Sequence, residues 1–128
     1  MRPPPALLVG AGGVAGALLR HAVSTAVDAQ SFPAATLTVN VVGTFALGLL
    51  AFGGVGGPLW PLVATGACGS FTTFSSFAVE SVRLWESGDR TRAAVYAAGT
   101  LAAAAGALGL AALVTSLTGR GLVSVPPA

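Results

Sequence analysis

The sequence predicts an all-α membrane protein with four transmembrane helices in a single domain that covers residues 1–128. Only 8% of the 128 residues are charged and 54% are hydrophobic, whereas soluble domains carry about 25% charged residues. Charged residues are absent from three runs, of 17 residues at 3–19, 51 residues at 29–79 and 27 residues at 93–119. The length suits one domain, so we expect neither a large transporter with internal repeats nor a separate soluble catalytic module.

The helix boundaries follow from these runs, because a helix needs about 20 apolar residues to cross a hydrocarbon core of about 30 Å. The 51-residue run is long enough for two spans, and the helix breakers in Gly53–Pro58 predict a turn between them. Trp60 and Trp85 would lie about 38 Å apart on one helix, which suits two membrane interfaces. We expect Tyr96 near an interface as well. The predicted helices span about 5–23, 33–52, 59–84 and 93–117.

The arginines give only a weak preference for one orientation in the membrane. With four spans, one side holds Arg2 and Arg120, and the other side holds Arg20, Arg83, Arg90 and Arg92. Because Lys and Arg in short loops set the topology, this small difference would allow insertion in both orientations and an antiparallel dimer. A single, weakly preferred orientation is the alternative. The basic residues form no cluster with interleaved aromatic residues, so we expect no nucleic-acid partner.

Polar residues inside the second and fourth predicted helices are candidates for a functional site, because such residues are costly in a membrane. The second helix carries three of them at a spacing of four, on one helix face: Thr36, Asn40 and Thr44. On the fourth helix, Thr100 lies one turn beyond Tyr96. Asn40 also has a simpler interpretation, a hydrogen bond that joins two helices.

The third predicted helix contains a segment that favours an interruption. Five hydroxyl side chains gather between Cys68 and Phe77, downstream of Gly66. Glycines beside so many hydroxyls predict a break near the middle of the helix, whose free carbonyls and amides need partners, for example a bound ion. Phe71 and Phe74 belong to a series at a spacing of three, for which packing is the simpler interpretation.

The chemistry that these residues share is the dehydration of a small anion. Amide and hydroxyl donors and the positive edges of aromatic rings can replace water around an anion without the fixed charge that would trap it. Glu80 lies about one turn from the predicted end of the third helix, and no carboxylate lies at a span centre, which argues against a proton-coupled antiporter. One His and one Cys supply no nucleophile–base pair, so we expect no enzyme. The residues alone predict a pore or channel with a neutral polar lining.

Three segments, in order along the chain, resemble motifs of the Fluc (CrcB-type) fluoride channels. Gly12–His21 resembles the GGxxGAxxR opening of that family, and Thr36–Phe45 resembles its TLxVNxxGxF second helix. Gly66–Phe77 is similar to the GxCGxxTTFSTF signature, which is the most specific of the three. With the chain length and the four spans, the resemblance covers nearly the whole sequence.

The resemblance implies a multi-pass channel of the bacterial cell (plasma) membrane that exports fluoride passively and relieves fluoride toxicity in the cytoplasm. It implies an antiparallel, dual-topology dimer with two pores, so the partners would be fluoride, the lipid bilayer and a second subunit. A structural Na⁺ at the dimer centre would be held by the backbone carbonyls of Gly69 and Thr72, in keeping with the preference of hard cations for oxygen.

The resemblance also assigns side chains to the pore. Asn40 would donate a hydrogen bond to fluoride, and the ring edges of two phenylalanines, Phe74 and Phe77, would line the pore. A polar track would contain Thr36, Ser76, Tyr96 and Thr100. Two further family positions are occupied by Arg20, which matches the motif arginine, and Glu80, a carboxylate in the vestibule.

Three positions depart from the family pattern. His21 stands where Tyr is more frequent, and Ser76 where Thr is more frequent; we expect both to be tolerated. Ala104 stands one turn after Thr100, where the family tends to carry a second hydroxyl, so the polar track is shortened. The chain could therefore act as a homodimer or with a paralogous subunit that supplies the hydroxyl.

Two alternatives from other classes of protein remain. A small four-helix multidrug or cation antiporter has the same size, but the first predicted helix lacks the carboxylate that such a mechanism requires. A non-transporting membrane scaffold would explain the small residues, but not the segment Thr72–Phe77.

Overall fold

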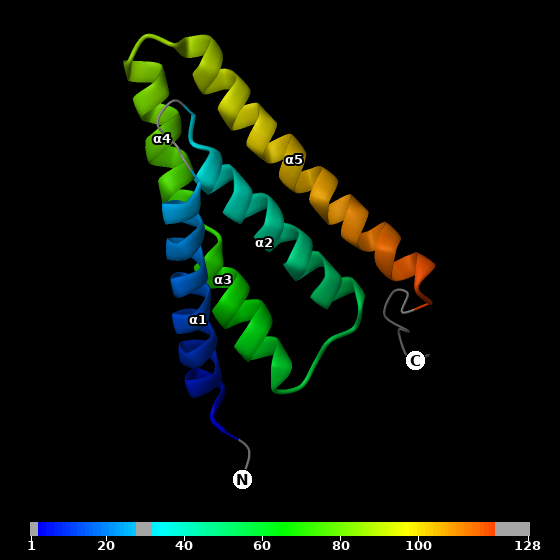
Figure 1. Ribbon diagram of the computed structural model, residues 1–128. Helices are drawn as coiled ribbons and strands as arrows, with labels where there is room; N and C mark the ends of the chain where they lie inside the picture. The colour runs from blue at the N-terminus through cyan, green and yellow to red at the C-terminus, as the bar shows by residue number, and fades with distance from the viewer. Residues whose placement is uncertain (1–2, 28–31, 120–128) are drawn as a thin grey trace.

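The protein is a bundle of long helices, and the computed structural model describes residues 3–27 and 32–119 (Figure 1). The described residues form six helical segments and no strand: α1 (Pro5–Ala26), α2 (Ala34–Phe52), η1 (Trp60–Cys68), α3 (Gly69–Phe71), α4 (Phe74–Glu86) and α5 (Arg90–Leu117). The π-helical segment η1 continues directly into α3, and α4 follows after two non-helical residues. These three segments make one interrupted span.

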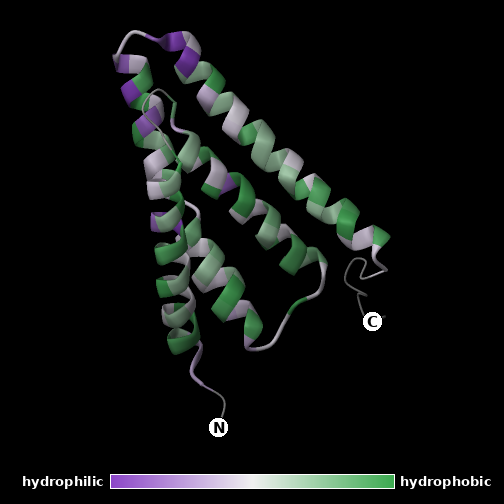
Figure 2. Ribbon diagram, viewed as in Figure 1, coloured by the Kyte–Doolittle hydropathy of each residue, from purple (hydrophilic) through white to green (hydrophobic). Residues whose placement is uncertain are grey.

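Four helices are long and apolar enough to cross a membrane: Pro5–Ala26, Ala34–Phe52, Trp60–Glu86 and Arg90–Leu117. This confirms the predicted number of spans. Hydrophobic ribbon covers most of each helix, and hydrophilic positions gather at the end where α4 meets α5 (Figure 2). Arg2 and Arg120 lie outside the described residues, so the balance of arginines across the membrane stays a prediction.

The predicted turn between the second and third spans is confirmed. Gly54 and Gly57 have φ angles of 69° and 62°, in the left-handed region that glycine adopts without a steric penalty. The turn reverses the chain between α2 and η1, so that consecutive spans run in opposite directions (Figure 1).

α1 is longer than predicted, because it ends at Ala26 rather than at 23. Hydroxyl groups near its end bond within the helix instead of interrupting it. The Ser24 hydroxyl donates to the carbonyl of Arg20 at 2.9 Å, and the Thr25 hydroxyl donates to the carbonyl of Ala22 at 2.9 Å. Such bonds let Ser and Thr continue a helix at little cost.

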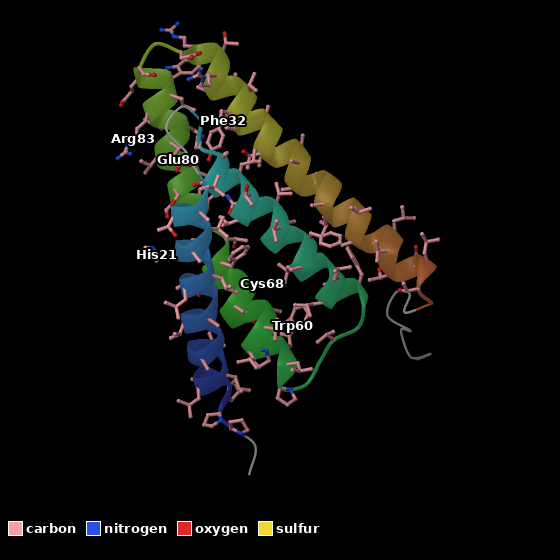
Figure 3. All side chains as sticks on the ribbon, viewed as in Figure 1. His21, Phe32, Trp60, Cys68, Glu80 and Arg83 are labelled. Atoms are coloured by element: carbon pink, nitrogen blue, oxygen red, sulfur yellow. The ribbon has the colours of Figure 1, made fainter. Side chains whose placement is uncertain are left out.

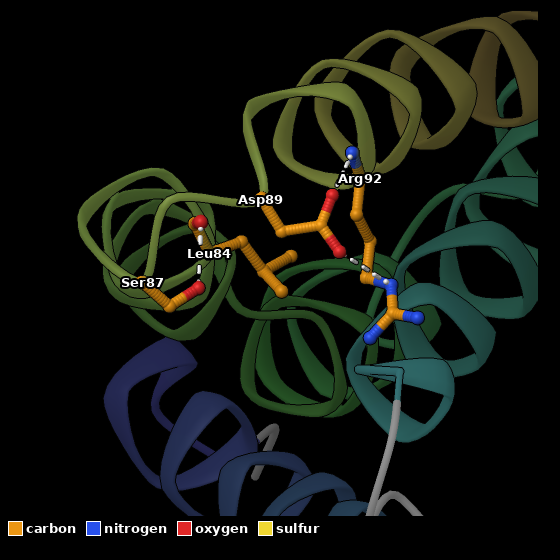
Figure 4. A network of polar contacts seen from close by, with 4 residues as sticks. All are labelled: Leu84, Ser87, Asp89 and Arg92. Carbon is orange, nitrogen blue, oxygen red and sulfur yellow. Dashed lines mark hydrogen bonds and ion pairs between the residues drawn. The ribbon is translucent and has the colours of Figure 1, made fainter.

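α4 also extends beyond its predicted end at 84, to Glu86. Gly88, with a φ of 87°, ends the helix, and the Ser87 hydroxyl donates to the carbonyl of Leu84 at 2.9 Å (Figure 4). Glu80 therefore lies six residues from the end of α4 rather than the predicted single turn, and so deeper in the span.

α5 begins at Arg90, three residues before the predicted start. Asp89 caps it: its carboxylate accepts a hydrogen bond from the Arg92 backbone N–H at 3.0 Å and forms an ion pair with the Arg92 Nε at 3.4 Å (Figure 4). The prediction started the helix after the last arginine, whereas an aspartate N-cap stabilises the helix from Arg90 onward. The first turn of α5 is therefore charged.

α1 packs against η1 at backbone distance, through glycines on both helices. A Cβ on Gly12 would overlap the carbonyl oxygen of Leu62, and a Cβ on Gly16 would overlap that of Ala67. From the side of η1, a Cβ on Gly66 would lie 2.6 Å from the carbonyl oxygen of Val9 in α1. The contact depends on the small–xxx–small spacing that brings membrane helices close together.

α5 lies along α2, and the buried core is small and lies mainly between these two helices (Figure 1). Val39 of α2 and Tyr96 of α5 are the largest fully buried side chains among the described residues. Gly48 lets the helices approach, because a Cβ there would lie 2.8 Å from the Cβ of Ala111. Many other large apolar side chains are exposed, as expected where the surroundings are lipid.

Candidate functional site

The third span is interrupted at its centre. Thr72 and Thr73 have extended backbones, with φ/ψ angles of −78°/159° and −149°/115°. Thr73 is the fourteenth residue of the 27-residue span Trp60–Glu86, so the break lies at the middle of the span. This confirms the predicted break. Polar backbone groups at this depth need partners inside the protein or in a water-filled cavity.

Asn40 supplies two of these partners. Its side-chain Nδ2 donates to the Thr73 carbonyl oxygen at 3.0 Å, and its Oδ1 accepts from the Thr73 N–H at 2.7 Å. The amide thus pairs with both polar groups of one residue and holds the break against α2. The interhelical role that was the simpler interpretation of Asn40 is observed, and one N–H of its amide is left for a ligand.

The Thr73 side chain starts the second half of the span. Its Oγ1 accepts from the Ser76 backbone N–H at 3.2 Å and donates to the Ser76 hydroxyl at 3.1 Å. The Ser75 hydroxyl lies 3.3 Å from the same oxygen. Thr73 is therefore the N-cap of α4 and gathers three hydroxyl groups at mid-membrane depth.

The break also releases the carbonyls that were predicted to hold Na⁺. The Thr73 N–H, which would bond to the Gly69 carbonyl in a continuous helix, donates to Asn40 instead. The Ser76 N–H, which would bond to the Thr72 carbonyl, donates to Thr73 Oγ1. Both carbonyl oxygens lose their helical donors, and carbonyl oxygen is a ligand that a hard cation accepts. The residues present therefore fit the implied ion.

Arg20 reaches the same place from the end of α1. Its Nη1 donates a long hydrogen bond of 3.5 Å to the Thr72 carbonyl oxygen. The guanidinium is partly buried and lies 52 positions from Thr72 in the sequence. The motif arginine thus contacts the break itself. The neighbouring His21 is exposed (Figure 3).

A second group of polar side chains centres on Glu80, in the second half of the third span. The Thr36 hydroxyl of α2 donates to Glu80 Oε1 at 2.9 Å, and the Tyr96 hydroxyl of α5 donates to Oε2 at 2.7 Å. Each carboxylate oxygen therefore has a neutral donor, and the group joins α2, α4 and α5. Three predicted site residues from three helices meet here.

Aromatic rings connect this group to the surface of the subunit. The Phe77 ring lies 5.5 Å from the Tyr96 ring and 5.9 Å from the Phe74 ring, measured between centroids. Phe32 makes an edge-to-face contact with the other side of Tyr96, at 5.6 Å. Phe74 is 79% exposed, whereas Phe77 is half-buried. The two predicted pore phenylalanines are neighbours, and Phe74 faces outward.

Tyr96 is buried inside the protein, and the expectation that it lies near a membrane interface stays a prediction. Tyr96 is 0% exposed and faces Glu80 and two phenylalanine rings. α5 begins at Arg90 rather than at 93, which moves Tyr96 further into the helix, and its hydroxyl is satisfied by a carboxylate instead of by water. One turn beyond it, Thr100 is 4% exposed, and its Oγ1 has no hydrogen-bond partner among the described residues.

A hollow of about 480 Å³ opens beside the break, on the outer face of α2 and the third span. Asn40 and the exposed residues Gly69 and Phe74 lie along its wall. Thr44, the third residue of the predicted polar stripe on the second helix, also lines it, together with Thr65, for which no role was predicted. Polar groups and irregular backbone are therefore exposed at the middle of the third span in a single subunit.

Sequence reasoning missed the central position of Thr73. The signal was present, because a Thr followed three residues later by a polar residue, at the start of a helical segment, is typical of an N-cap. Sequence reasoning treated Thr72–Phe77 as a cluster of hydroxyls and did not identify Thr73 as an N-cap. The contact of Arg20 with the break had no signal in the sequence, because the two segments are distant along the chain.

The sequence matches the family described as CrcB-like protein, Camphor Resistance (CrcB), over residues 7–115. A Haloarcula marismortui protein named fluoride-specific ion channel FluC 2 is 60% identical over 104 residues, which cover 81% of this chain and 87% of that protein. A Halobacterium salinarum protein named fluoride-specific ion channel FluC 1 is 46% identical over 113 residues, 88% of this chain and 95% of that protein.

A relative from Paracoccus denitrificans, named fluoride-specific ion channel FluC, is 41% identical over 122 residues, which cover 91% of this chain and 94% of the relative. The family resemblance inferred from the three motifs is thereby confirmed. With four apolar spans, a broken third span and a match over residues 7–115, the chain belongs to the CrcB-like protein family.

Proposed function

We propose that this protein is a fluoride-selective ion channel that exports fluoride passively and so relieves fluoride toxicity in the cytoplasm. The observation that carries the proposal is the similarity to proteins named fluoride-specific ion channels, which reaches 60% identity over 81% of the chain. The uncharged hydrogen-bond donors at the break, such as the Asn40 amide, also suit the conduction of an anion. No observation favours an antiporter or a scaffold, and nothing in the family similarity points to an enzyme.

The exposed break supports an antiparallel dimer as the working form. Irregular backbone at mid-membrane depth is tolerated only where protein or a water-filled cavity covers it. In a single subunit the hollow beside Gly69 and Phe74 would face lipid. A second copy in the opposite orientation covers it with its own break, because the break lies at the midpoint of the span.

Asn40 and the phenylalanines would form the narrow part of the pore. The Asn40 amide, held by Thr73, keeps one N–H for the anion. Phe74 and Phe77 present ring edges, which carry partial positive charge. The hydroxyl of Ser76, which accepts from Thr73, keeps its own proton and continues the donor series. Thr36 and Tyr96 each donate their one hydroxyl proton to Glu80 and so form part of the polar wall. Neutral donors bind fluoride weakly enough for release, as conduction requires.

The half-buried carboxylate of Glu80 organises the polar track. It accepts from Thr36 and Tyr96, and so fixes the directions of both hydroxyl groups. A fixed negative charge also raises the energy of an anion near it. We propose that fluoride passes beside Phe77 and Ser76, away from the carboxylate.

Na⁺ belongs to the proposal as a structural ion at the dimer centre, held by the Gly69 and Thr72 carbonyls of both copies. When bound, it would supply positive charge that offsets the dipoles of these carbonyls, which have no donor within a helix. Arg20 supplies part of this charge in each subunit through its contact with Thr72.

We propose the cell membrane as the location, because passive export relieves the cytoplasm only across the membrane that bounds it. That the cell is a bacterium stays a prediction. The second subunit is either another copy of this chain or a paralogous subunit that supplies the hydroxyl missing at Ala104. Rapid fluoride release from liposomes that contain only this chain would contradict an obligatory paralogous partner.

The deciding experiment is fluoride efflux from liposomes that contain the purified protein, recorded with a fluoride electrode. We expect rapid efflux from the wild type and efflux near that of empty liposomes for Asn40→Asp and Phe77→Ile, while both variants remain dimers in size-exclusion chromatography. Asp cannot donate to the Thr73 carbonyl and brings a charge to mid-membrane depth, and Ile lacks the ring edge.

Two matched variants serve as controls. Thr38→Val removes only a hydrogen bond of 2.8 Å to the Ala34 carbonyl within α2, and Phe45→Ile changes a ring in the apolar groove between α2 and α5. Both should conduct as the wild type does. Absence of fluoride efflux from the wild type, both alone and together with a paralogous subunit, would contradict the proposed function. Full efflux in both test variants would contradict only the pore assignment.

The orientation is tested by labelling a single cysteine. In a Cys68→Ala background, Ser87→Cys places a thiol in the exposed loop between α4 and α5. A membrane-impermeant reagent added outside cells should label about half of the protein if both orientations are present. Labelling of nearly all or nearly none of it would contradict dual topology.

A further inference from the structure

A second depression, of about 250 Å³, lies on the outer face of α4. Its lining residues are Ser75, Ser76, Val79, Glu80 and Arg83. Ser75 and Arg83 are eight positions apart, which is about 12 Å along a helix. Arg83 lies near the end of the span, whereas Ser75 adjoins Phe74 at the break. The depression therefore leads from interfacial depth to the proposed pore.

Arg83 is the only cation in this depression, and it is exposed. The one ion pair between side chains that the described part of the chain forms joins Asp89 and Arg92 and leaves Arg83 out. In Figure 3, Arg83 points away from the neighbouring helices. A guanidinium in this position can attract an anion, because no carboxylate of the described residues neutralises it at contact distance.

Glu80 lines the same depression, but its charge is directed to the other side of α4. Both of its oxygens accept hydrogen bonds from buried donors, Thr36 Oγ1 and the Tyr96 hydroxyl. The hydroxyls of Ser75 and Ser76 lie at the N-terminal end of α4, where the helix dipole also favours negative charge. The depression thus has a cation at its outer end and donors at its inner end.

We propose that this depression is a staging site for the anion: Arg83 concentrates fluoride at the mouth of the pore, and the Ser75 hydroxyl is an early donor on the way to Phe74 and Asn40. The site rests on the proposed channel function. It takes a small, hydrated monovalent anion, because it offers one exposed cation and hydroxyl donors rather than several fixed charges. Arg83 is a residue that raises the local concentration of the ion, not one that selects it.

The test measures initial fluoride efflux against internal fluoride concentration, in liposomes at low and at high ionic strength of an impermeant salt. For Arg83→Gln we expect the half-saturating fluoride concentration to rise about twofold to fivefold at 10 mM ionic strength, where the screening length is about 30 Å. The difference from the wild type should shrink at 500 mM salt, and Arg83→Lys should behave as the wild type does. Ser75→Ala should raise the half-saturating concentration by about twofold at either salt concentration.

Arg90→Gln is the matched control. It removes the same charge from the same end of the molecule, where Arg90 lies over the Trp85 ring at 5.1 Å and outside the depression. Equal effects of Arg83→Gln and Arg90→Gln, or no effect of Arg83→Gln, would overturn the staging site while leaving the channel function intact. A wild type that releases no fluoride, both alone and with a paralogous subunit, would instead contradict the proposed function.

A phosphate of a lipid headgroup is another source of negative charge that Arg83 could bind. The same variants are therefore compared in liposomes with and without anionic lipid. We expect the shift in half-saturation for Arg83→Gln in both. An effect that appears only with anionic lipid, or a loss of the dimer peak in Arg83→Gln, would overturn the proposal in favour of a lipid or subunit contact.

Discussion

The two halves of the third span are held in different ways. The first half, η1 and α3, packs on α1 at backbone distance, and glycines at positions 12, 16 and 66 leave no room for side chains between the helices. The second half, α4, has no buried residue, and hydrogen bonds of Thr73 and Glu80 and the ring contacts of Phe77 connect it to the rest.

This difference teaches how a small membrane protein combines stability with a polar pathway. Close backbone packing supplies van der Waals contact where no hydrophobic effect drives helices together. Polar and aromatic contacts hold α4 and at the same time provide the donors that an anion needs. A change in the first half should therefore act on folding, and a change in the second half on transport.

The largest effect is expected for Gly12→Ala in the first half. The new Cβ would overlap the Leu62 carbonyl, so α1 and η1 must separate. We expect a loss of about 3 kcal/mol in the free energy of unfolding, seen as a lower midpoint in thermal unfolding and as loss of the monodisperse dimer peak. Gly10→Ala, with open space around the new Cβ, should be stable. Equal stability of both variants would contradict the difference between the two halves.

An intermediate effect is expected for Tyr96→Phe, which removes one of the two donors to Glu80. A buried carboxylate oxygen without its donor costs about 1–3 kcal/mol. We expect this loss in the free energy of unfolding in detergent, together with reduced fluoride efflux. In a double-mutant cycle with Glu80→Gln, the double mutant should lose less free energy of unfolding than the sum of the two single losses. Additive losses would mean that the 2.7 Å contact contributes nothing.

The smallest effect on stability is expected for Thr100→Val. The Thr100 hydroxyl is buried and has no partner among the described residues, so its removal should change the free energy of unfolding by less than about 1 kcal/mol. If the hydroxyl serves the polar track, efflux should fall by about twofold although stability is kept. Thr115→Val, whose hydroxyl bonds only to carbonyls of its own helix, should leave efflux unchanged. Equal efflux in both variants would remove Thr100 from the track.

The sequence predicted the features that depend on composition along the chain. Gaps between charges located the four spans, and glycines beside hydroxyls located the break. It could not predict how Asn40 pairs with Thr73, because spacing on one helix does not show which backbone groups of another helix it faces. The π-helical form of η1 and the burial of Tyr96 could not be predicted for the same reason, since both depend on contacts between distant segments.

The central position of Thr73 constrains where residues can be inserted into or deleted from the protein. Thirteen residues of the third span precede Thr73 and thirteen follow it. In an inverted pair, one residue inserted before the break would move the two breaks in opposite directions, by about 1.5 Å each along the membrane normal. The facing segments would lose register by about 3 Å. Insertions and deletions should therefore accumulate in the loops, and a lengthened third span should survive only with a second, compensating change.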